Sequence, residues 1–161
     1  MDTTACGSVR GFTLKEKLFA QISFNGGVII GTYGLFQHDI SLAVIYFLYA
    51  YIGIFLVVRY TVCPRCPHLH GAGDCLQLKA SLTRRIISKN RKGPLNLYEK
   101  ILFVMVIYGI LIFPVYWIAS DLIVLILFLL FYGGSLLGLW LYFCRECQNQ
   151  TCIQNRCSSR C

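Results

Sequence analysis

Charged side chains are scarce in this chain. Asp, Glu, Lys and Arg make up 14% of its 161 residues, against about 25% in a typical soluble domain. Hydrophobic residues make up 57%. This balance excludes an ordinary soluble globular protein and indicates an integral membrane protein. The length predicts one membrane domain over residues 1–161.

Several functional motifs are also missing. The sequence has no glycine-rich phosphate loop and no Ser-His-Asp arrangement, so nothing in it indicates a hydrolase, a kinase or a nucleotide site. The apolar segments carry no ionisable side chain and no Cys or His inside the bilayer, where a metal-transport pathway would need them. A metal transporter is therefore disfavoured.

Four apolar segments are long enough, or nearly so, for the roughly 20 residues that a bilayer-spanning helix needs. They are Leu18–Phe36, Ile40–Val62, Ile101–Ala119 and Leu122–Phe143. The first is the most polar, because it contains Gln21 and Asn25 together with several glycines. We therefore predict an all-α, four-helix membrane bundle in contact with the lipid bilayer.

The basic residues predict the orientation. All 15 Lys and Arg residues fall in the N-terminal arm, the central loop with its flanks, or the tail, and the two short turns at 37–39 and 120–121 have none. The positive-inside rule then places both termini and the central loop in the cytoplasm, in a multi-pass protein of the cell membrane. The net charge of +8 is read as this orientation signal. No aromatic-interleaved basic motif accompanies it, so no nucleic-acid partner is expected.

An internal repeat is the most informative feature of the sequence. "EKLFAQISFNGG" from Glu16 resembles "EKILFVMVIYG" from Glu99, and an acidic turn residue follows 23 residues after the first Glu and 22 after the second. A C-x-x-C pair begins 47 residues after Glu16 and 45 after Glu99. We predict two duplicated hairpins, repeat 1 over 16–75 and repeat 2 over 99–152, with a linker at 76–98 and a cysteine-rich tail at 153–161. Parallel repeats of this kind are related by an axis along the membrane normal.

Local patterns add four expectations. Residues 74–89 predict a cytoplasmic amphipathic helix at the membrane surface, and Asn96-x-x-Glu99 predicts a capping box that opens the third span. Gly27-x-x-x-Gly31 and Gly134-x-x-x-Gly138 favour close packing of the first and fourth helices. Gln21 and Asn25 indicate hydrogen bonds between helices, or alternatively a small polar pocket for a quinone or a lipid headgroup.

Nine residues are candidate metal ligands. Two thiolates three residues apart can bind one ion, and two such pairs complete a tetrahedral S₄ site, while the same four sulfurs could hold an iron–sulfur cluster. The candidates are Cys63, Cys66, Cys75, Cys144, Cys147, Cys152, Cys157, His68 and His70. Zinc and iron–sulfur both remain open. Two separate three-cysteine sites are the alternative to one shared centre.

The same cysteines allow other functions. A cysteine-ligated centre would suit a structural or electron-relay subunit, or a protein that docks a larger membrane complex or a cytoplasmic redox partner. Alternatively, the C-x-x-C pairs could exchange electrons with a quinone, as in a membrane thiol–quinone oxidoreductase. Palmitoylated juxtamembrane cysteines in a membrane scaffold are a further alternative. Whether the protein is an enzyme stays open.

The cysteine segments carry a family resemblance. "CPRCPHLHGAGDC", the basic segment "LKASLTRR" after it, and "CRECQNQTCIQNRC" after the last span resemble a group of small, cysteine-rich, four-helix prokaryotic membrane proteins. The resemblance covers both halves of the chain. That group has no established activity, so the resemblance implies an organisation and no particular reaction.

Overall fold

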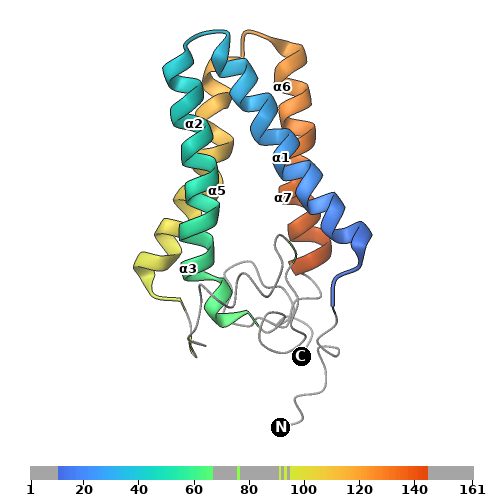
Figure 1. Ribbon diagram of the computed structural model, residues 1–161, viewed down its shortest axis with the longest axis vertical. Coiled ribbons are helices and arrows are strands. Elements are labelled where there is room, and N and C mark those ends of the chain that lie inside the picture. The colour runs from blue at the N-terminus through green and yellow to red at the C-terminus, as the bar shows by residue number, and fades with distance from the viewer. Residues whose placement is uncertain (1–10, 67–75, 77–90, 92, 94, 145–161) are drawn as a thin grey trace.

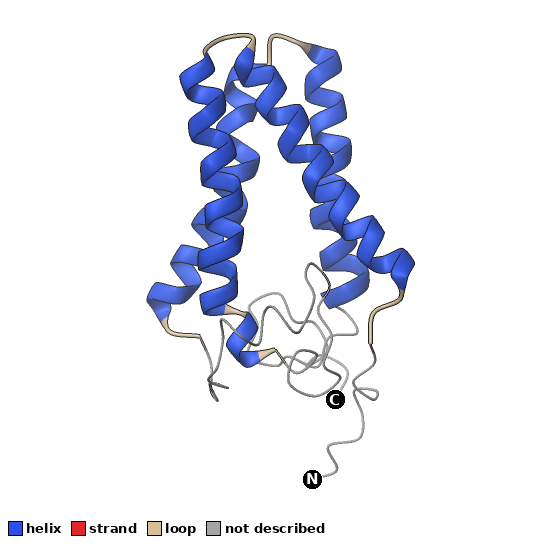
Figure 2. Ribbon diagram, in the orientation of Figure 1, coloured by secondary structure: helices blue, strands red, loops and turns tan. Residues whose placement is uncertain are grey.

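The computed structural model describes residues 11–66, 76, 91, 93 and 95–144. Most of these residues are helical, with no strand among them, and the helices form four long rods joined as two hairpins (Figures 1 and 2). The first rod is α1 (Leu14–Phe36) and the third is α5 (Leu97–Ile118). The predicted amphipathic helix at 74–89 falls almost wholly outside the described residues.

The second and fourth rods each consist of several consecutive helical segments. The second rod contains α2 (Ile40–Ile52), the π-helical segment η1 (Gly53–Val58), α3 (Arg59–Thr61) and the 3₁₀ turn η2 (Cys63–Arg65). The fourth rod contains α6 (Leu122–Phe128), the π-helical η4 (Leu129–Gly133), α7 (Gly134–Gly138) and the π-helical η5 (Leu139–Phe143). The sequence did not predict these π-helical segments.

Three helices are long and apolar enough to cross a membrane, namely Ile40–Arg65, Leu97–Ile118 and Leu122–Phe143. Only 22–28% of the most apolar part of each is buried inside the bundle, so most of their apolar side chains face outward, as contact with lipid requires. α1 is 23 residues long but does not reach the same apolarity. Its polar side chains, Gln21 and Asn25 among them, and its four glycines lower the hydropathy of this helix.

Each hairpin starts and turns with the same kinds of cap. Glu16 accepts a hydrogen bond from the backbone N–H of Thr13 at 2.7 Å, and Glu99 accepts one from Asn96 at 3.0 Å, so the predicted cap at the third helix is confirmed. Asp39 accepts from the N–H of Ser41 at 2.6 Å, and this bond holds the pKa of Asp39 below its usual value. Asp121 caps α6 in the same way. These caps satisfy N–H groups that a helix start leaves without intrahelical partners.

Glycines allow the first and fourth helices to approach closely. A Cβ atom on Gly27 would lie 2.7 Å from the Cβ and 3.0 Å from the backbone nitrogen of Tyr132. A Cβ on Gly138 would lie 2.8 Å from the ring of Phe19. The predicted packing of these helices is therefore confirmed. Gly134 was a wrong choice for this role, because none of the described residues lies within 4 Å of the position its Cβ would take.

Tyrosine hydroxyls from the neighbouring helices donate to the backbone of α5. Tyr46 donates to the carbonyl of Ile110 at 3.2 Å, and Tyr132 donates to that of Ile107 at 3.0 Å. Both tyrosines are buried in the core. Because no water reaches the middle of a bilayer, such internal partners are what a buried hydroxyl requires.

Asn25 makes the interhelical bond that the sequence suggested. Its Oδ1 accepts a hydrogen bond from the hydroxyl of Tyr51 at 2.7 Å, while its Nδ2 donates to the carbonyl of Gln21 within α1. The Asn25 side chain therefore joins the first helix to the second, as the structural interpretation of this pair predicted.

Candidate functional site

The first C-x-x-C pair forms a tight turn at the end of the second helix. Cys63 begins the 3₁₀ turn η2, and the N–H of Cys66 donates to the carbonyl of Cys63 at 3.1 Å. Pro64 lies inside the turn and is buried, and both cysteines are partly buried. A turn of this kind keeps two sulfurs three residues apart in the chain close together, which is the arrangement a chelating thiolate pair needs.

A buried ion pair fixes this turn to the third helix. Arg65, between the two cysteines, contacts the carboxylate of Glu99 at 3.0 Å, and both side chains are only 7% exposed. Arg65 also donates to the carbonyl of Thr61 at 2.9 Å. Removing one partner of such a pair leaves a buried charge uncompensated. The position of the cysteine turn therefore depends on the start of α5.

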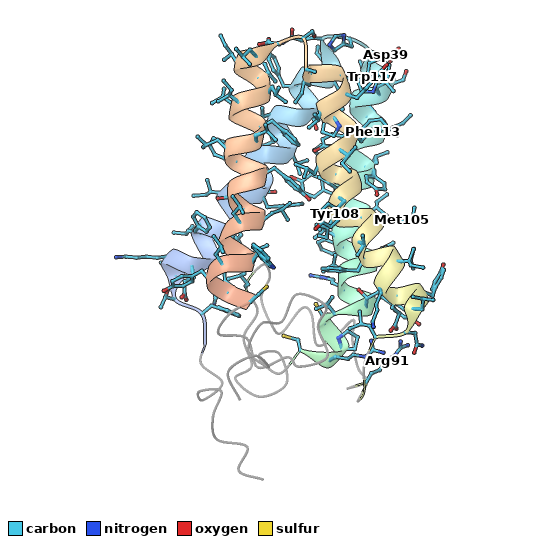
Figure 3. All side chains as sticks on the ribbon, turned by 180° about the vertical axis from the view of Figure 1, so that it is seen from behind. Asp39, Arg91, Met105, Tyr108, Phe113 and Trp117 are labelled. Atoms are coloured by element: carbon cyan, nitrogen blue, oxygen red, sulfur yellow. The ribbon has the colours of Figure 1, made fainter. Side chains whose placement is uncertain are left out.

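The segment before α5 contacts the same turn. The N–H of Arg91 donates to the carbonyl of Pro64 at 3.1 Å, and its guanidinium lies 3.3 Å from Glu99 and donates to the hydroxyl of Tyr60 at 3.0 Å. The bond to Tyr60 raises the pKa of Arg91, so Arg91 stays cationic. Figure 3 shows Arg91 at the end of the bundle opposite to Asp39. Glu99 thus holds two arginines beside the cysteine turn.

The second C-x-x-C pair begins at the same end of the bundle. Cys144 directly follows η5 at the end of the fourth helix and is partly buried. The second and fourth helices end at the same end of the bundle, away from the two short turns, but on opposite sides of it (Figure 1). The structure therefore puts Cys144 at the same end as Cys63 and Cys66, on a different hairpin.

The other six candidate ligands lie outside the described residues. They are Cys75, Cys147, Cys152, Cys157, His68 and His70. Among residues 11–66, 76, 91, 93 and 95–144, no three Cys, His, Asp or Glu side chains are grouped closely enough to hold a metal ion. The described part of the chain thus contains one half of the predicted S₄ site and the first cysteine of the other half.

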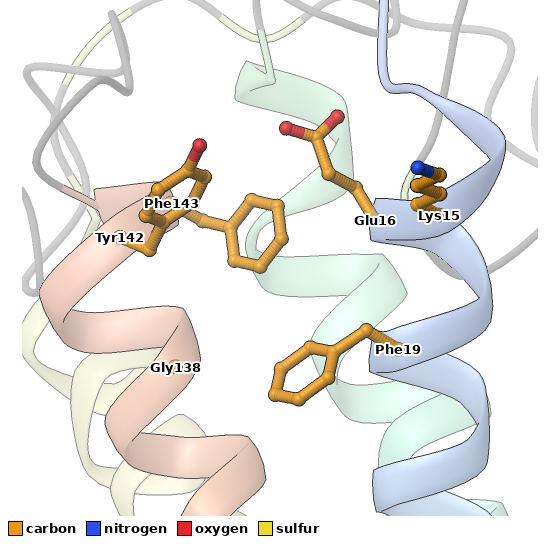
Figure 4. A pocket seen from close by; sticks show the side chains of 6 residues that line it. All are labelled: Lys15, Glu16, Phe19, Gly138, Tyr142 and Phe143. Atoms are coloured by element: carbon orange, nitrogen blue, oxygen red, sulfur yellow. The ribbon is translucent and has the colours of Figure 1, made fainter.

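A pocket of about 380 Å³ lies between the start of α1 and the end of the fourth helix, and Phe143, the residue before Cys144, is part of its wall. Its wall is mostly apolar, with one lysine and one glutamate at the rim (Figure 4). The lining residues are Lys15, Glu16, Phe19, Gly138, Tyr142 and Phe143. Such a pocket could accept an apolar ring or chain at the membrane boundary.

Two features of this end were not foreseen from the sequence. The ion pairs of Glu99 were missed because Arg65 and Arg91 were counted only as orientation signals. Arg59, counted in the same way, is 5% exposed, and its two terminal nitrogens have no hydrogen-bond partner among the described residues.

Comparison of this chain with protein-family models, with curated proteins and with solved structures finds no match.

Proposed function

We propose that this is a four-span membrane protein whose two C-x-x-C pairs hold a cysteine-ligated metal or iron–sulfur centre at the cytoplasmic end of the bundle. The centre would join the two hairpins and act as a structural or electron-relay element, or as a docking point for a partner. The cytoplasmic assignment rests on the distribution of Lys and Arg. The observation that carries the proposal is the Cys63–Cys66 turn, held in place by Arg65 and Glu99.

The geometry of that turn supports ligation over an incidental pair of thiols. A buried ion pair and the hydrogen bond from Arg91 to Pro64 hold the turn against two other segments. Preorganised ligands supported by surrounding contacts are typical of metal sites. Zinc and an iron–sulfur cluster both suit a set of cysteine thiolates.

Repeated contacts support the proposed duplication. Tyr51 lies 12 residues before Cys63, and Tyr132 lies 12 residues before Cys144. Tyr51 donates to Asn25, nine residues after Glu16, and Tyr132 donates to Ile107, eight residues after Glu99. Corresponding tyrosines thus bond to corresponding turns of the helix before them.

The pairing of helices is consistent with the same symmetry. α1 contacts α6, η4 and α7 of the fourth helix, and α5 contacts α2, η1 and α3 of the second. A two-fold axis that exchanges the hairpins would convert the first pairing into the second. Under that axis the two C-x-x-C pairs share one depth, and α1 is the fourth membrane span, with exposed apolar side chains such as Ile22 and Ile29.

A second candidate function is favoured by the pocket at the end of the fourth helix. A membrane thiol–quinone oxidoreductase would need an apolar site near a cysteine pair, and the pocket is lined by Tyr142 and Phe143, which directly precede Cys144 in the chain. In that reaction two thiols would form a disulfide, and their two electrons and two protons would convert a quinone to a quinol. Reduced protein mixed with a water-soluble quinone would then form the quinol and lose two thiols.

The two candidates are separated by metal analysis and visible spectroscopy of protein purified without oxygen. A bound centre predicts a fixed amount of zinc or iron per chain, with broad absorption near about 400 nm for iron–sulfur and no colour for zinc. Metal-free protein that reduces a quinone would instead support the oxidoreductase. Metal-free protein with no quinone reduction would leave the palmitoylated scaffold, which mass spectrometry detects as a lipid adduct.

A further inference from the structure

Arg59 is a buried cation without a counter-ion in the described part of the chain. Its side chain is 5% exposed, and neither Nη1 nor Nη2 has a hydrogen-bond partner there. An arginine stays charged at any physiological pH, so it cannot relieve its burial by losing a proton. A buried charge of this kind is costly unless an anion accompanies it.

The described charges beside the cysteine turn do not supply that anion. Arg65 and Arg91 both contact the single carboxylate of Glu99. The three arginines contribute +3 and Glu99 contributes −1, so this group carries a net charge of +2. Glu99 already has two cationic partners, and Arg59 is the arginine left over.

Arg59 lies at the depth where lipid phosphates are found. The helix Ile40–Arg65 has 26 residues, which is about 39 Å at 1.5 Å per residue, whereas the hydrocarbon core is about 30 Å thick. About 20 residues cross that core, and counting them from Ile40, next to the short turn, ends at Arg59. The guanidinium therefore lies at the boundary between the hydrocarbon and the headgroups.

The side chain of Arg59 does not reach toward water. Its guanidinium carbon lies 3.9 Å from the ring centre of Phe55, one turn closer to the middle of the span. A lysine or arginine near the end of a span ordinarily extends outward to place its charge in water. The ring of Phe55 is 42% exposed, so the guanidinium lies beneath a side chain that faces the lipid.

We propose that Arg59 is the anchor of a phosphate-binding site at the membrane boundary, and that the phosphate belongs to an anionic phospholipid. A guanidinium donates two parallel hydrogen bonds to a phosphate, which suits the two nitrogens without partners. Because Arg59 is only 5% exposed and lies against the ring of Phe55, that ring, which is itself exposed, must turn aside for the phosphate to reach the guanidinium. The site is distinct from the cysteine centre, because the guanidinium of Arg59 lies over the ring of Phe55, four residues before it, whereas Cys63 lies four residues after it.

The test measures binding of lipid to the full-length protein in detergent. Thermal unfolding and native mass spectrometry follow the addition of phosphatidylglycerol, of phosphatidylcholine and of inorganic phosphate. The wild type is expected to bind phosphatidylglycerol and to melt at a higher temperature with it than with phosphatidylcholine. Arg59→Gln should weaken that binding roughly tenfold, the effect of losing a charge-assisted hydrogen-bond pair. Arg59→Lys keeps the charge and loses the paired geometry, so it should fall between the two.

Lys100→Gln is the matched control, because Lys100 is an exposed cation at the same end of the bundle. It should bind phosphatidylglycerol as the wild type does. An equal response to inorganic phosphate would support the phosphate site and assign it to the free ion. Unchanged lipid binding in Arg59→Gln would overturn the site. An Arg59→Gln protein that loses metal and still binds lipid would also overturn it, because the cysteine centre would then be the counter-ion of Arg59. If Arg59→Gln does not fold, unchanged lipid binding in Arg59→Lys would also overturn it.

Discussion

The hydroxyl of Tyr46 donates a hydrogen bond, at 3.2 Å, to the carbonyl of Ile110, four residues before Pro114. In a regular helix that carbonyl accepts from the N–H of residue 114, but proline has none. α5 continues through Pro114, and Tyr46 from the second helix supplies the missing donor. Ile110, Pro114 and Tyr46 are all fully buried. The interface of the second and third helices therefore satisfies a backbone group that the sequence of α5 leaves without a partner.

Tyr46→Phe should lower the free energy of unfolding by about 1–2 kcal/mol, because it leaves the carbonyl of Ile110 without a donor. In the background of Pro114→Ala the new N–H can occupy that carbonyl, so the same change should cost less. A double-mutant cycle in detergent measures the difference. Tyr108→Phe, at a half-exposed residue of α5, should change the free energy of unfolding very little. Equal costs in the two backgrounds would show that Pro114 and Tyr46 are not coupled.

Gly27→Ala should destabilise the bundle by about 1–3 kcal/mol, the usual cost of forcing an extra carbon into a close contact. The added methyl would meet the backbone of Tyr132, which cannot turn away as a side chain can. Gly134→Ala serves as the control, because a Cβ at that position would contact none of the described residues within 4 Å. Thermal unfolding of the two variants gives the comparison. A Gly27→Ala protein as stable as Gly134→Ala would contradict the close approach of α1 and η4.

Glu99 has two roles that two substitutions can separate. Glu99→Gln keeps a side chain that can still cap α5 but loses the charge that Arg65 and Arg91 share. We expect it to cost about 3 kcal/mol, as breaking a buried ion pair does. Glu99→Ala loses the cap as well, so it should be less stable than Glu99→Gln. Chemical or thermal unfolding orders the three proteins, with Lys100→Gln as the control for a lost charge. A Glu99→Gln protein as stable as wild type would make the ion pairs unimportant.

The orientation predicts which ends of the bundle a membrane-impermeant thiol reagent can reach. In intact cells Cys6 and Cys161 should remain unlabelled, because the positive-inside rule places both termini in the cytoplasm. A His38→Cys variant, with its new thiol in the short turn at the other end, should be labelled. The reverse pattern would invert the topology and remove the argument that the cysteines lie in a reducing compartment.

Much of the bundle follows from short sequence patterns, for identifiable reasons. The Asn96–Glu99 cap and the Gly27 contact depend on spacing along one helix, which a sequence displays directly. The hydrogen bond between Tyr46 and Ile110 joins residues 64 positions apart, and its partner is a backbone group that no side-chain pattern marks. The ion pairs of Glu99 with Arg65 and Arg91 could not be predicted either, because the sequence indicated Glu99 only as a helix cap and the two arginines only as orientation signals.

The candidate centre was predictable only as a set of ligand types. The C-x-x-C spacing indicated the Cys63–Cys66 turn, and the repeat indicated that Cys144 lies at the same end of the bundle. Which sulfurs meet depends on Cys75 and Cys147, at or near the ends of the two repeats, and these are outside the described residues. Shared ligation by both hairpins therefore stays a prediction.

The central claim is that one cysteine-ligated centre joins the two hairpins, and metal content in a paired-cysteine variant tests it most directly. Cys66→Ser combined with Cys147→Ser removes one ligand from each pair, whereas Cys6→Ser changes a cysteine that has no counterpart in the repeat. Because metal binding adds to the free energy of folding, the double variant should lose both its metal and part of its thermal stability, while Cys6→Ser keeps both. A double variant with the wild-type metal content and melting temperature would show that these cysteines are not ligands.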